Sequence, residues 1–429
     1  MRRLDSQLPV RYFKVTLFIG TIVSLIVATL YETGWLFRLE AELGAFLGSA
    51  APQPRPHYDR IVQYAAFISL AFGISWTTID ISRNSLRFII AAGAVLEVII
   101  AWWILGLYGI SFSPFGSLIA ILCSFSAALL YSRSEGGMRK KVVRDIFGDR
   151  VSRRSSYALV NSNIPLHFHG ERCDATIVVC EIFNHEELSD VLPVADYVAM
   201  NNSFLRNAAD FLVERGGYLD ECDGESLRVV FGTPLPDREH ALHAAAAALA
   251  LAERLDAVNR ECQQVWDQIF DFRIGLNSGE MVVAAYGSQR LGNFSVAGEP
   301  VEFARRLCAA NTIYGSRILI GSATFCAAER EIEVRPIELL QRSADTRSRE
   351  EIYELLALQN VLGEEDRVRR DIFWKGIVYY REHRWDEALA SFHQARAANG
   401  SDGPIEFYIR RVEQLRTGLP ALEFTPRKL

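Results

Sequence analysis

One carboxyl group in this sequence lies where a charge is hard to accommodate, which makes it the first candidate for chemistry. Glu97 stands inside the apolar stretch Leu86–Ile110, and a carboxyl group within a membrane-spanning helix is costly and often functional. The alternative is that Glu97 only forms hydrogen bonds within a helical bundle or lies near a headgroup layer. Glu302 and Arg306 have the four-residue spacing at which opposite charges pair on a helix surface.

The thiol groups do not indicate a metal centre. The seven cysteines are scattered, odd in number and without C-x-x-C spacing, so neither a zinc site nor a disulfide framework is expected. We interpret them as small buried side chains of a protein in a reducing compartment. They are Cys123, Cys173, Cys180, Cys222, Cys262, Cys308 and Cys326.

Length and composition indicate two or three domains of different character. The 429 residues carry a formal net charge of -6, which offers no basic field for nucleic acid, and no nucleic-acid partner is expected. Residues 15–131 are mostly apolar, whereas the remainder has an ordinary cytosolic mixture. This composition excludes a disordered chain, a collagen-like chain and a small secreted disulfide scaffold.

Four apolar stretches predict a transmembrane domain over residues 1–132. Each has close to the roughly 20 residues that a helix needs to cross a lipid bilayer. The first stretch is not a cleavable signal peptide, because no small-residue cleavage site follows it. The stretches are Val15–Tyr31, Ile61–Ile81, Leu86–Ile110 and Phe115–Tyr131.

The distribution of lysine and arginine predicts that both ends of the chain are cytoplasmic. Basic residues flank the first and last stretches and occupy the second connection, where Arg83 and Arg87 lie, while the third connection has none. After the fourth stretch, Met138, Val142 and Ile146 recur at helical spacing. Residues 133–172 are therefore predicted to form a signalling linker helix, whose apolar stripe pairs with a second copy or packs on the next domain.

Strands and helices alternate from residue 173 onward. The order strand, helix, two strands, helix, strand predicts a ferredoxin-like α+β domain with extra strands. The expected strands are Ala175–Cys180, Tyr218–Leu219, Leu227–Phe231, Phe270–Leu276, Met281–Ala285, Phe294–Ala297 and, as the last, Arg317–Ile320. The expected helices are Val194–Leu212, His240–Cys262 and Val301–Ala310.

Several ordered segments together resemble the class III adenylate/guanylate cyclases. They are Phe147-Gly-Asp-Arg-Val-Ser152, Ala175-Thr-Ile-Val-Val-Cys-Glu-Ile-Phe-Asn184, Gly216-Gly-Tyr-Leu219 with Asp223-Gly-Glu-Ser-Leu-Arg-Val-Val-Phe-Gly232, Arg273-Ile-Gly-Leu-Asn-Ser-Gly-Glu-Met-Val-Val283 and Gly298-Glu-Pro-Val-Glu-Phe-Ala-Arg-Arg-Leu307. The resemblance covers about residues 138–357. It implies a cyclase-like catalytic domain over residues 173–357 and a bacterial protein of the inner membrane.

The resemblance also implies a reaction. In this family a ribose 3′-oxygen attacks the α-phosphorus of a nucleoside triphosphate and expels pyrophosphate. Two Mg or Mn ions held by carboxylates assist, and the site forms between two copies, so the implied partner is the chain itself or a homologous cyclase. ATP is favoured over GTP as the substrate.

Carried over by position, the metal ligands of the family fall on Glu181 and Glu225, with Ile182 beside them. The base-reading pair falls on Glu221 and Ser295. The catalytic positions fall on Glu302, which replaces a ribose-orienting asparagine, and on Arg306. The phosphate-binding loop carries Asn184 and His185.

These residues depart from the family pattern. Both metal-position side chains are one methylene longer than the family's aspartate, although Asp223 could partly compensate. Glu186, Glu187, Glu221 and Glu302 add negative charge near a polyanionic substrate. A second phosphate-binding lysine is missing near residues 340–343, where Arg342 is a weak candidate.

Residues 363–418 resemble one tetratricopeptide repeat, of the kind that follows some bacterial membrane cyclases. The small and large residues Gly376, Tyr379, Ala388, Phe392 and Ala395 alternate as two close helices require. A helical hairpin that docks on the cyclase-like domain is predicted. The alternative is a hairpin without a partner.

The sequence therefore predicts a membrane-anchored protein that converts ATP to cyclic AMP, with two alternatives left open. The first is a degenerate cyclase domain that dimerises as a regulator. The second is a membrane sensor whose cytosolic domain binds another ligand in the same pocket.

Overall fold

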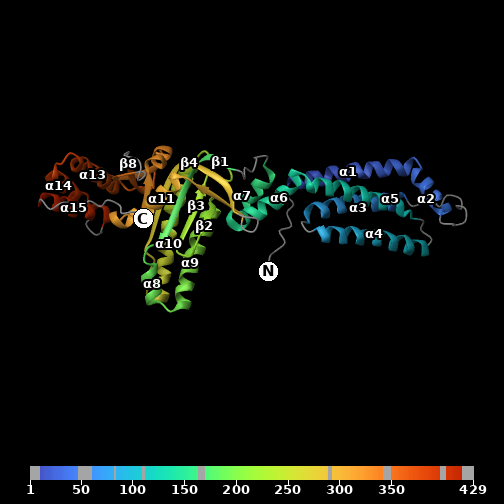
Figure 1. Cartoon of the computed structure of the whole chain (residues 1–429), viewed down its shortest axis with the longest axis horizontal. Coiled ribbons are helices and arrows are strands. Elements are labelled where there is room, and N and C mark those ends of the chain that lie inside the picture. The colour runs from blue at the N-terminus through green and yellow to red at the C-terminus, as the bar shows by residue number, and fades with distance from the viewer. Residues whose placement is uncertain are drawn as a thin grey trace. The chain divides into compact units, whose positions relative to one another are not determined.

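The computed structural model describes residues 10–46, 60–81, 84–108, 112–162, 170–287, 292–341, 349–396 and 402–417. The chain divides into two compact units. The first comprises residues 1–145 with 157–163, and the second comprises residues 146–156 with 164–429. Figure 1 shows both units.

The first unit is built from long apolar helices. Its elements are α1 (Val10–Glu32), α2 (Trp35–Phe46), α3 (Arg60–Asp80), α4 (Asn84–Leu107), α5 (Pro114–Arg133), most of α6 (Glu135–Ile146) and the end of α7 (Arg153–Asn161). The helices α1, α3, α4 and α5 are long and apolar enough to cross a membrane, which confirms the four predicted apolar helices.

Small residues let the helices of this bundle approach closely. Ala71 of α3 and Ala120 of α5 are fully buried with Val27 and Phe67, and Gly20 lies directly against the Phe72 ring. The linker and several helix ends meet at one end of the bundle. There the Tyr12 hydroxyl donates to the Gly136 carbonyl (3.1 Å), Lys140 pairs with Asp80 (2.6 Å), and Arg87 donates to Ser132 (3.0 Å). The start of α1 and the end of α5 therefore share one end, as an even number of crossings requires.

The linker is not the single helix that was predicted over residues 133–172. Helix α6 is followed by a short 3-10 turn (Gly148–Arg150) and by α7, and strand β1 already begins at Glu171. The positive φ of Gly148 (47°) ends α6, since few residues other than glycine adopt that backbone conformation.

The second unit has a large sheet at its centre, with the order β2-β3-β1-β4-β6-β8-β7 and with β5 paired to β4. The strands are β1 (Glu171–Ile182), β2 (Tyr218–Cys222), β3 (Ser226–Phe231), β4 (Phe272–Gly287), β5 (Gly292–Ala297), β6 (Ile318–Gly321), β7 (Ile332–Gln341) and β8 (Arg349–Leu358). The antiparallel part β2-β3-β1-β4 has the connectivity of the predicted ferredoxin-like fold.

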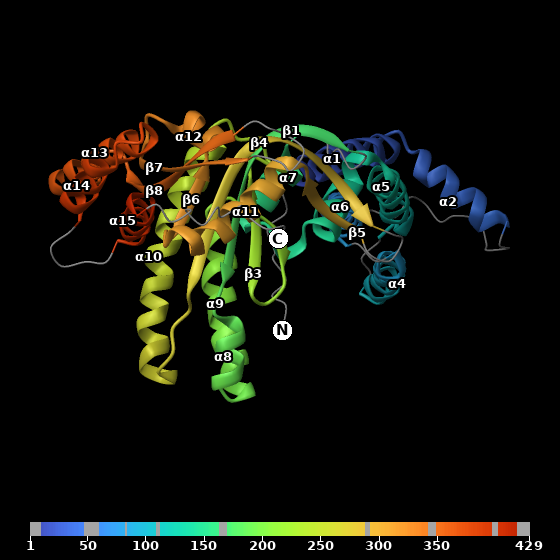
Figure 2. The ribbon, with the colours of Figure 1, turned by 60° about the vertical axis from the view of Figure 1, so that its left-hand side comes forward.

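Helices cover both faces of this sheet (Figure 2). One face carries α9 (Val194–Glu214), α10 (His240–Trp266) and α12 (Ser322–Ala328). The short helix α8 (His185–Val191) directly precedes α9. The alanine-rich side of α10 allows close packing on β1. The other face carries α11 (Glu299–Tyr314), which approaches β4 so closely that a Cβ on Gly275 would lie 2.3 Å from the Ala304 carbonyl oxygen.

Two strand predictions were wrong. Phe270–Leu276 and Met281–Ala285 belong to one strand, β4, because its ladder with β1 continues from Val283 to Phe272 through the polar Asn277-Ser278-Gly279. β6 is not the last strand, since β7 and β8 follow it. Their alternation is obscured by charged residues such as Arg335 and Glu354, which are buried as an ion pair (2.6 Å).

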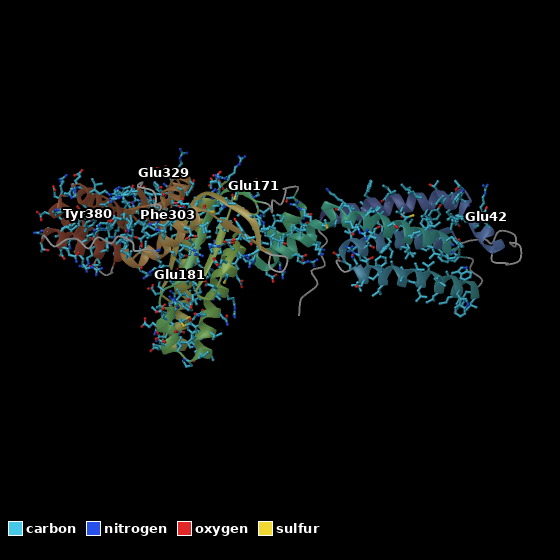
Figure 3. All side chains as sticks on the ribbon, viewed as in Figure 1. Glu42, Glu171, Glu181, Phe303, Glu329 and Tyr380 are labelled. Atoms are coloured by element: carbon cyan, nitrogen blue, oxygen red, sulfur yellow. The ribbon has the colours of Figure 1, made fainter. Side chains whose placement is uncertain are left out.

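The tail contains three helices rather than the predicted hairpin: α13 (Glu364–Arg381), α14 (Trp385–Ala395) and α15 (Gly403–Arg416). As expected, it docks on the sheet domain. Phe373, Phe392 and Tyr408 of the tail share one core with Phe303 of α11 and Ile352 of β8. Figure 3 labels Phe303 on the sheet domain and Tyr380 on the tail.

Gly376 is predicted to control tail packing, because a Cβ there would lie 2.7 Å from Phe392 Cε1. Gly376→Val should lower the free energy of unfolding by about 1–3 kcal/mol through overpacking. Lys375→Val is the matched control, because Lys375 directly precedes Gly376 in α13 and its side chain is exposed. Urea-dependent pulse proteolysis of the tail measures both variants, and equal shifts would contradict this packing role.

Candidate functional site

Glu181 stands near the end of β1 on the face that α11 covers. Its neighbours Cys180 and Ile182 point into the core beneath α9 and α10, so strand alternation turns Glu181 to the opposite face. Glu181 is paired in the ladder with Ser226 of β3. Figure 3 labels the side chain.

A turn between β2 and β3 brings Glu225 to the same place. The Ile182 amide donates to the Glu225 carbonyl (2.9 Å), which ties the end of β1 to this turn. The Asp223 carboxylate accepts hydrogen bonds from the backbone amides of Glu225 (3.2 Å) and Ser226 (2.8 Å). Asp223 thus holds the turn together, and its contacts give it a structural task in addition to the compensating role that the sequence suggested.

The carboxyl groups at this point crowd one another. Burial raises the pKa of Glu181, the charge of Asp223 raises it further and Glu225 adds to the effect, while His185 and Arg305 lower it. His185, the first residue of α8, lies with Nδ1 3.3 Å from a Glu225 carboxylate oxygen. The structure therefore gathers Glu181, Glu225 and His185 into one cluster.

The donor atoms of this cluster suit a hard divalent cation. Carboxylate oxygens are the preferred ligands of Mg²⁺ and Mn²⁺, and a cation would relieve the repulsion that raises the pKa of Glu181. Glu181 and Glu225 would hold it, beside the backbone of Ile182. Within the described part of the chain, no group of three or more His, Cys, Asp or Glu side chains is arranged to hold a metal by itself. Glu181 and Glu225 would therefore be the two principal protein ligands of a cation.

A β-bulge places Glu221 on the α11 face. Leu219 pairs with Val229, but Glu221 pairs with Arg228, so the register shifts at Asp220. The shift turns Glu221 to the same side of the sheet as Arg228. There one carboxylate oxygen of Glu221 contacts both Arg228 (2.9 Å) and Arg305 of α11 (3.0 Å).

Helix α11 carries the two predicted catalytic positions. Glu302 is exposed in its first turn, where a negative charge is favoured by the helix dipole. Arg306 is half-buried, with its guanidinium 5.8 Å from the centre of the Phe303 ring. A pair between Glu302 and Arg306 stays a prediction.

The remaining predicted residues lie at the border of this cluster. The Asn184 side-chain amide donates to the Ile269 carbonyl (2.9 Å) and accepts from the Asp271 backbone amide (2.8 Å). Asn184 therefore stabilises the loop before β4. Ser295 is half-buried on β5, opposite Ala284. Arg342 lies outside the described residues, as does Arg83 of the second connection.

The linker contacts the same strands. Phe147 packs edge-on against Tyr218 of β2 and Phe294 of β5, with ring centres 5.8 and 4.9 Å away. Arg150 donates to the carbonyl of Asp220 (3.1 Å), the bulge residue. The Asp220 carboxylate in turn accepts from Arg228. A continuous chain of polar contacts thus joins the linker to Glu221 and α11.

Sequence reasoning missed Arg228, Arg305 and Arg150. Arg305 is the direct neighbour of Arg306 and carried no spacing signal of its own. Its importance depends on the bulge at Asp220, which sets the direction of Glu221 and cannot be inferred from a strand pattern.

A comparison with protein-family models now bears on this geometry. Residues 171–338 match the model described as the adenylate and guanylate cyclase catalytic domain. This segment is thus similar to the class III cyclase catalytic domain. It contains β1, the β2–β3 hairpin and α11, and therefore every residue of the cluster described above.

Two curated relatives match less than half of this chain. An uncharacterized protein of Mycobacterium tuberculosis (strain H37Rv) is 31% identical over 201 residues, 46% of this chain and 33% of that protein. Adenylate cyclase 1 of Rhizobium meliloti is 26% identical over 174 residues, 40% of this chain and 26% of that protein. The chain thus spans about a third or less of the length of these relatives.

Solved structures resemble the same part of the chain. The guanylyl cyclase Cya2 is 26% identical, with a TM-score of 0.42, and the match covers 45% of this chain and 97% of that structure. The adenylyl cyclase CyaB of P. aeruginosa is 22% identical, with a TM-score of 0.42, and the match covers 46% of this chain and all of that structure.

The crowded carboxylates of the cyclase domain predict a specific pH dependence. A raised pKa in the folded state means that stability is lost as pH rises through the pKa of folded Glu181. Glu181→Gln should therefore stabilise the cyclase domain at pH 8 relative to the wild type, and much less at pH 4. Mn²⁺ should raise the melting temperature of the wild type but not of this variant.

The matched control is Glu253→Gln, which removes an exposed carboxyl group of α10 that lies outside this cluster. Thermal unfolding at both pH values, with and without Mn²⁺, measures the effect. If both variants follow the same pH profile, Glu181 is not the crowded carboxyl group.

Proposed function

We propose that this chain is a membrane-anchored nucleotide cyclase that acts as a dimer and converts ATP to 3′,5′-cyclic AMP and pyrophosphate. The convergence of Glu181 and Glu225 beside the arginines of α11 supports this proposal most strongly. In this proposal Glu181 and Glu225 would hold the metal and Arg306 of α11 would contact the phosphate, all within the segment that matches the cyclase family model.

The proposed reaction is an internal displacement. The bond between the ribose 3′-oxygen and the α-phosphorus forms, the bond to pyrophosphate breaks, and the 3′-hydroxyl proton leaves to solvent. Divalent metal, when bound, neutralises triphosphate charge and activates the attacking oxygen. Glu181 and Glu225 provide its ligands, with His185 close to Glu225. Arg306 stabilises charge that develops on the α-phosphate.

The choice of ATP rests on the relative named adenylate cyclase and on the family reaction. Glu221 and Ser295 would contact the base edge. A carboxylate can accept hydrogen bonds from the amino group of adenine or from the ring N–H and amino group of guanine. Glu221 accepts a hydrogen bond from Arg305 and pairs with Arg228 on the same oxygen, so these two arginines restrict its orientation before a base arrives.

The anchoring part of the proposal rests on the four apolar helices. The chain would lie in the inner membrane of a bacterium with both ends in the cytoplasm. A second copy would complete the active site, as the resemblance implies.

A degenerate, regulatory cyclase domain is the second candidate, and two contacts favour it. His185 occupies a carboxylate oxygen of Glu225, and Arg305 occupies Glu221. Such a domain would dimerise without turnover.

Activity measurements separate the two candidates. Full-length protein in vesicles should form cyclic AMP from ATP, faster with Mn²⁺ than with Mg²⁺, because Mn²⁺ is less strict about ligand geometry. Glu181→Ala and Arg306→Ala should each lower kcat by at least about a hundredfold. Glu253→Gln, an exposed change on α10, is the control and should leave kcat unchanged. Folded, dimeric protein without product under all these conditions would favour the regulatory candidate.

Arg305 should influence the choice of base rather than the chemistry. Arg305→Ala leaves Glu221 with Arg228 alone and should change the ratio of kcat/KM for ATP and GTP by about fivefold, the factor for about 1 kcal/mol from a half-exposed ion pair. Arg305→Lys keeps the charge and should retain most of the ratio. An unchanged ratio in Arg305→Ala would make this pair a surface contact without function.

A further inference from the structure

Helix α4 is the least covered of the four long helices in the first unit. Only 6% of an apolar 18-residue segment of α4 is buried, compared with 28%, 33% and 39% of the corresponding segments of α1, α3 and α5. Figures 1 and 2 both show α4 at the edge of this bundle. It contacts α3 and α5 through Ala94 and Val98, which pack with Ile74 and Ile121. Val95 and Leu105 also pack against this cluster and Phe88 contacts Phe125, whereas most of the other residues of α4 are exposed.

One outward stripe of α4 is distinguished by Gly93 and Glu97, and its residues have the spacing of a helix–helix seam. Its six residues follow one another at intervals of four, three, four, three and four, which is the heptad spacing of left-handed helix pairs. Five are exposed and one is half-buried. They are Leu86, Ile90, Gly93, Glu97, Ile100 and Ile104.

Glu97 occupies the middle of this stripe. Glu97 is the fourteenth of the 24 residues of α4. At 1.5 Å per residue it lies about 2 Å along the helix axis from the midpoint of the helix. Its carboxyl group is exposed, and no hydrogen bond or ion pair joins it to another residue of the described chain. The sequence left open that Glu97 forms hydrogen bonds within the helical bundle. Within the described part of the unit, it forms none.

Gly93 creates space one turn before Glu97. A Cβ on Gly93 would meet no atom within 4 Å. Inside the bundle, by contrast, a Cβ on Gly20 would meet the Phe72 ring at 2.5 Å. Small residues at an outer helix face allow a second backbone to approach closely within a membrane.

We propose that α4 pairs with α4 of a second copy of this chain, with the two Glu97 carboxyl groups facing each other beside the two Gly93 backbones. This inference rests on the membrane placement in the proposed function. Lipid tails offer no hydrogen bond to a carboxyl group at mid-membrane.

A second copy fits this stripe for two reasons. A two-fold axis along the membrane normal brings identical residues of the seam together. A carboxylic acid is both donor and acceptor, so it is its own complement. A single polar residue in an apolar seam also fixes the register of a helix pair.

Disulfide formation in membranes tests this pairing in the full-length chain. Ile100→Cys lies on the seam, whereas Ile99→Cys is equally exposed on another side of the helix. Oxidation should link Ile100→Cys chains into dimers at several times the yield of Ile99→Cys chains. The unchanged chain gives the background from native cysteines. Equal yields at positions 99 and 100 would overturn the proposal.

Changes within the seam give a second, independent test. In the Ile100→Cys background, Gly93→Leu should reduce the disulfide yield strongly, whereas Ala92→Leu, the neighbouring exposed position, should not. Glu97→Leu should weaken pairing about three- to thirtyfold, the range for one hydrogen bond between membrane helices, and Glu97→Gln should restore much of it because an amide also donates and accepts. Unchanged yields in Gly93→Leu and Glu97→Leu would contradict the seam.

A membrane-impermeant thiol reagent shows separately whether α4 lies in the bilayer. It therefore distinguishes helices that do not pair from a helix that is not in the membrane. If α4 lies in the bilayer, the cysteines at positions 99 and 100 both resist the reagent, whether or not the helices pair. If both react, the membrane placement itself is wrong. Neither readout depends on cyclase activity. Disulfides between α4 and a different protein would also overturn the pairing of two copies.

Discussion

The burial of Glu181 beside two other carboxylates at the end of β1 is the constraint that the surrounding elements of this domain have to balance. Glu181, Asp223 and Glu225 are brought together by a backbone hydrogen bond and by a tight turn, both of which act regardless of charge. Basic side chains from other elements lie against this negative charge. His185 comes from α8 and Arg305 from α11, so the cluster links three layers of the fold.

The bulge at Asp220 serves the same balance. It exposes the Asp220 carbonyl to Arg150 of the linker and turns Glu221 toward Arg228 and Arg305. Asp220 is itself buried and paired with Arg228, which is almost fully covered. A movement of the linker would therefore alter the position of Glu221 on the face that α11 covers, through short, charged contacts. Phe147, held between two aromatic rings, gives the linker a firm hold on the same strands.

Much of this arrangement could be predicted from sequence, and the failures have local causes. The long apolar helices and the buried strand β1 follow from continuous hydrophobicity, and the neighbourhood of Glu181 and Glu225 follows from the resemblance. The bulge could not be predicted, because Tyr218 to Glu221 show no alternation and the shift depends on pairing with β3. β4 was divided in two because polar residues interrupt its pattern, whereas the long partner β1 keeps it continuous.

The charge pattern on the face that α11 covers also explains why the departures from the family pattern need not be independent. Glutamate at position 221 would repel a triphosphate if it stood alone. Arg305 and Arg228 both contact it, and each side chain of the Glu221–Arg305 pair remains about half exposed. The pair therefore retains access to solvent and to a ligand, while its net charge is lower than that of a free carboxylate. In this respect the extra arginine of α11 and the glutamate of β2 form one unit, so a change at either residue is best interpreted together with the other.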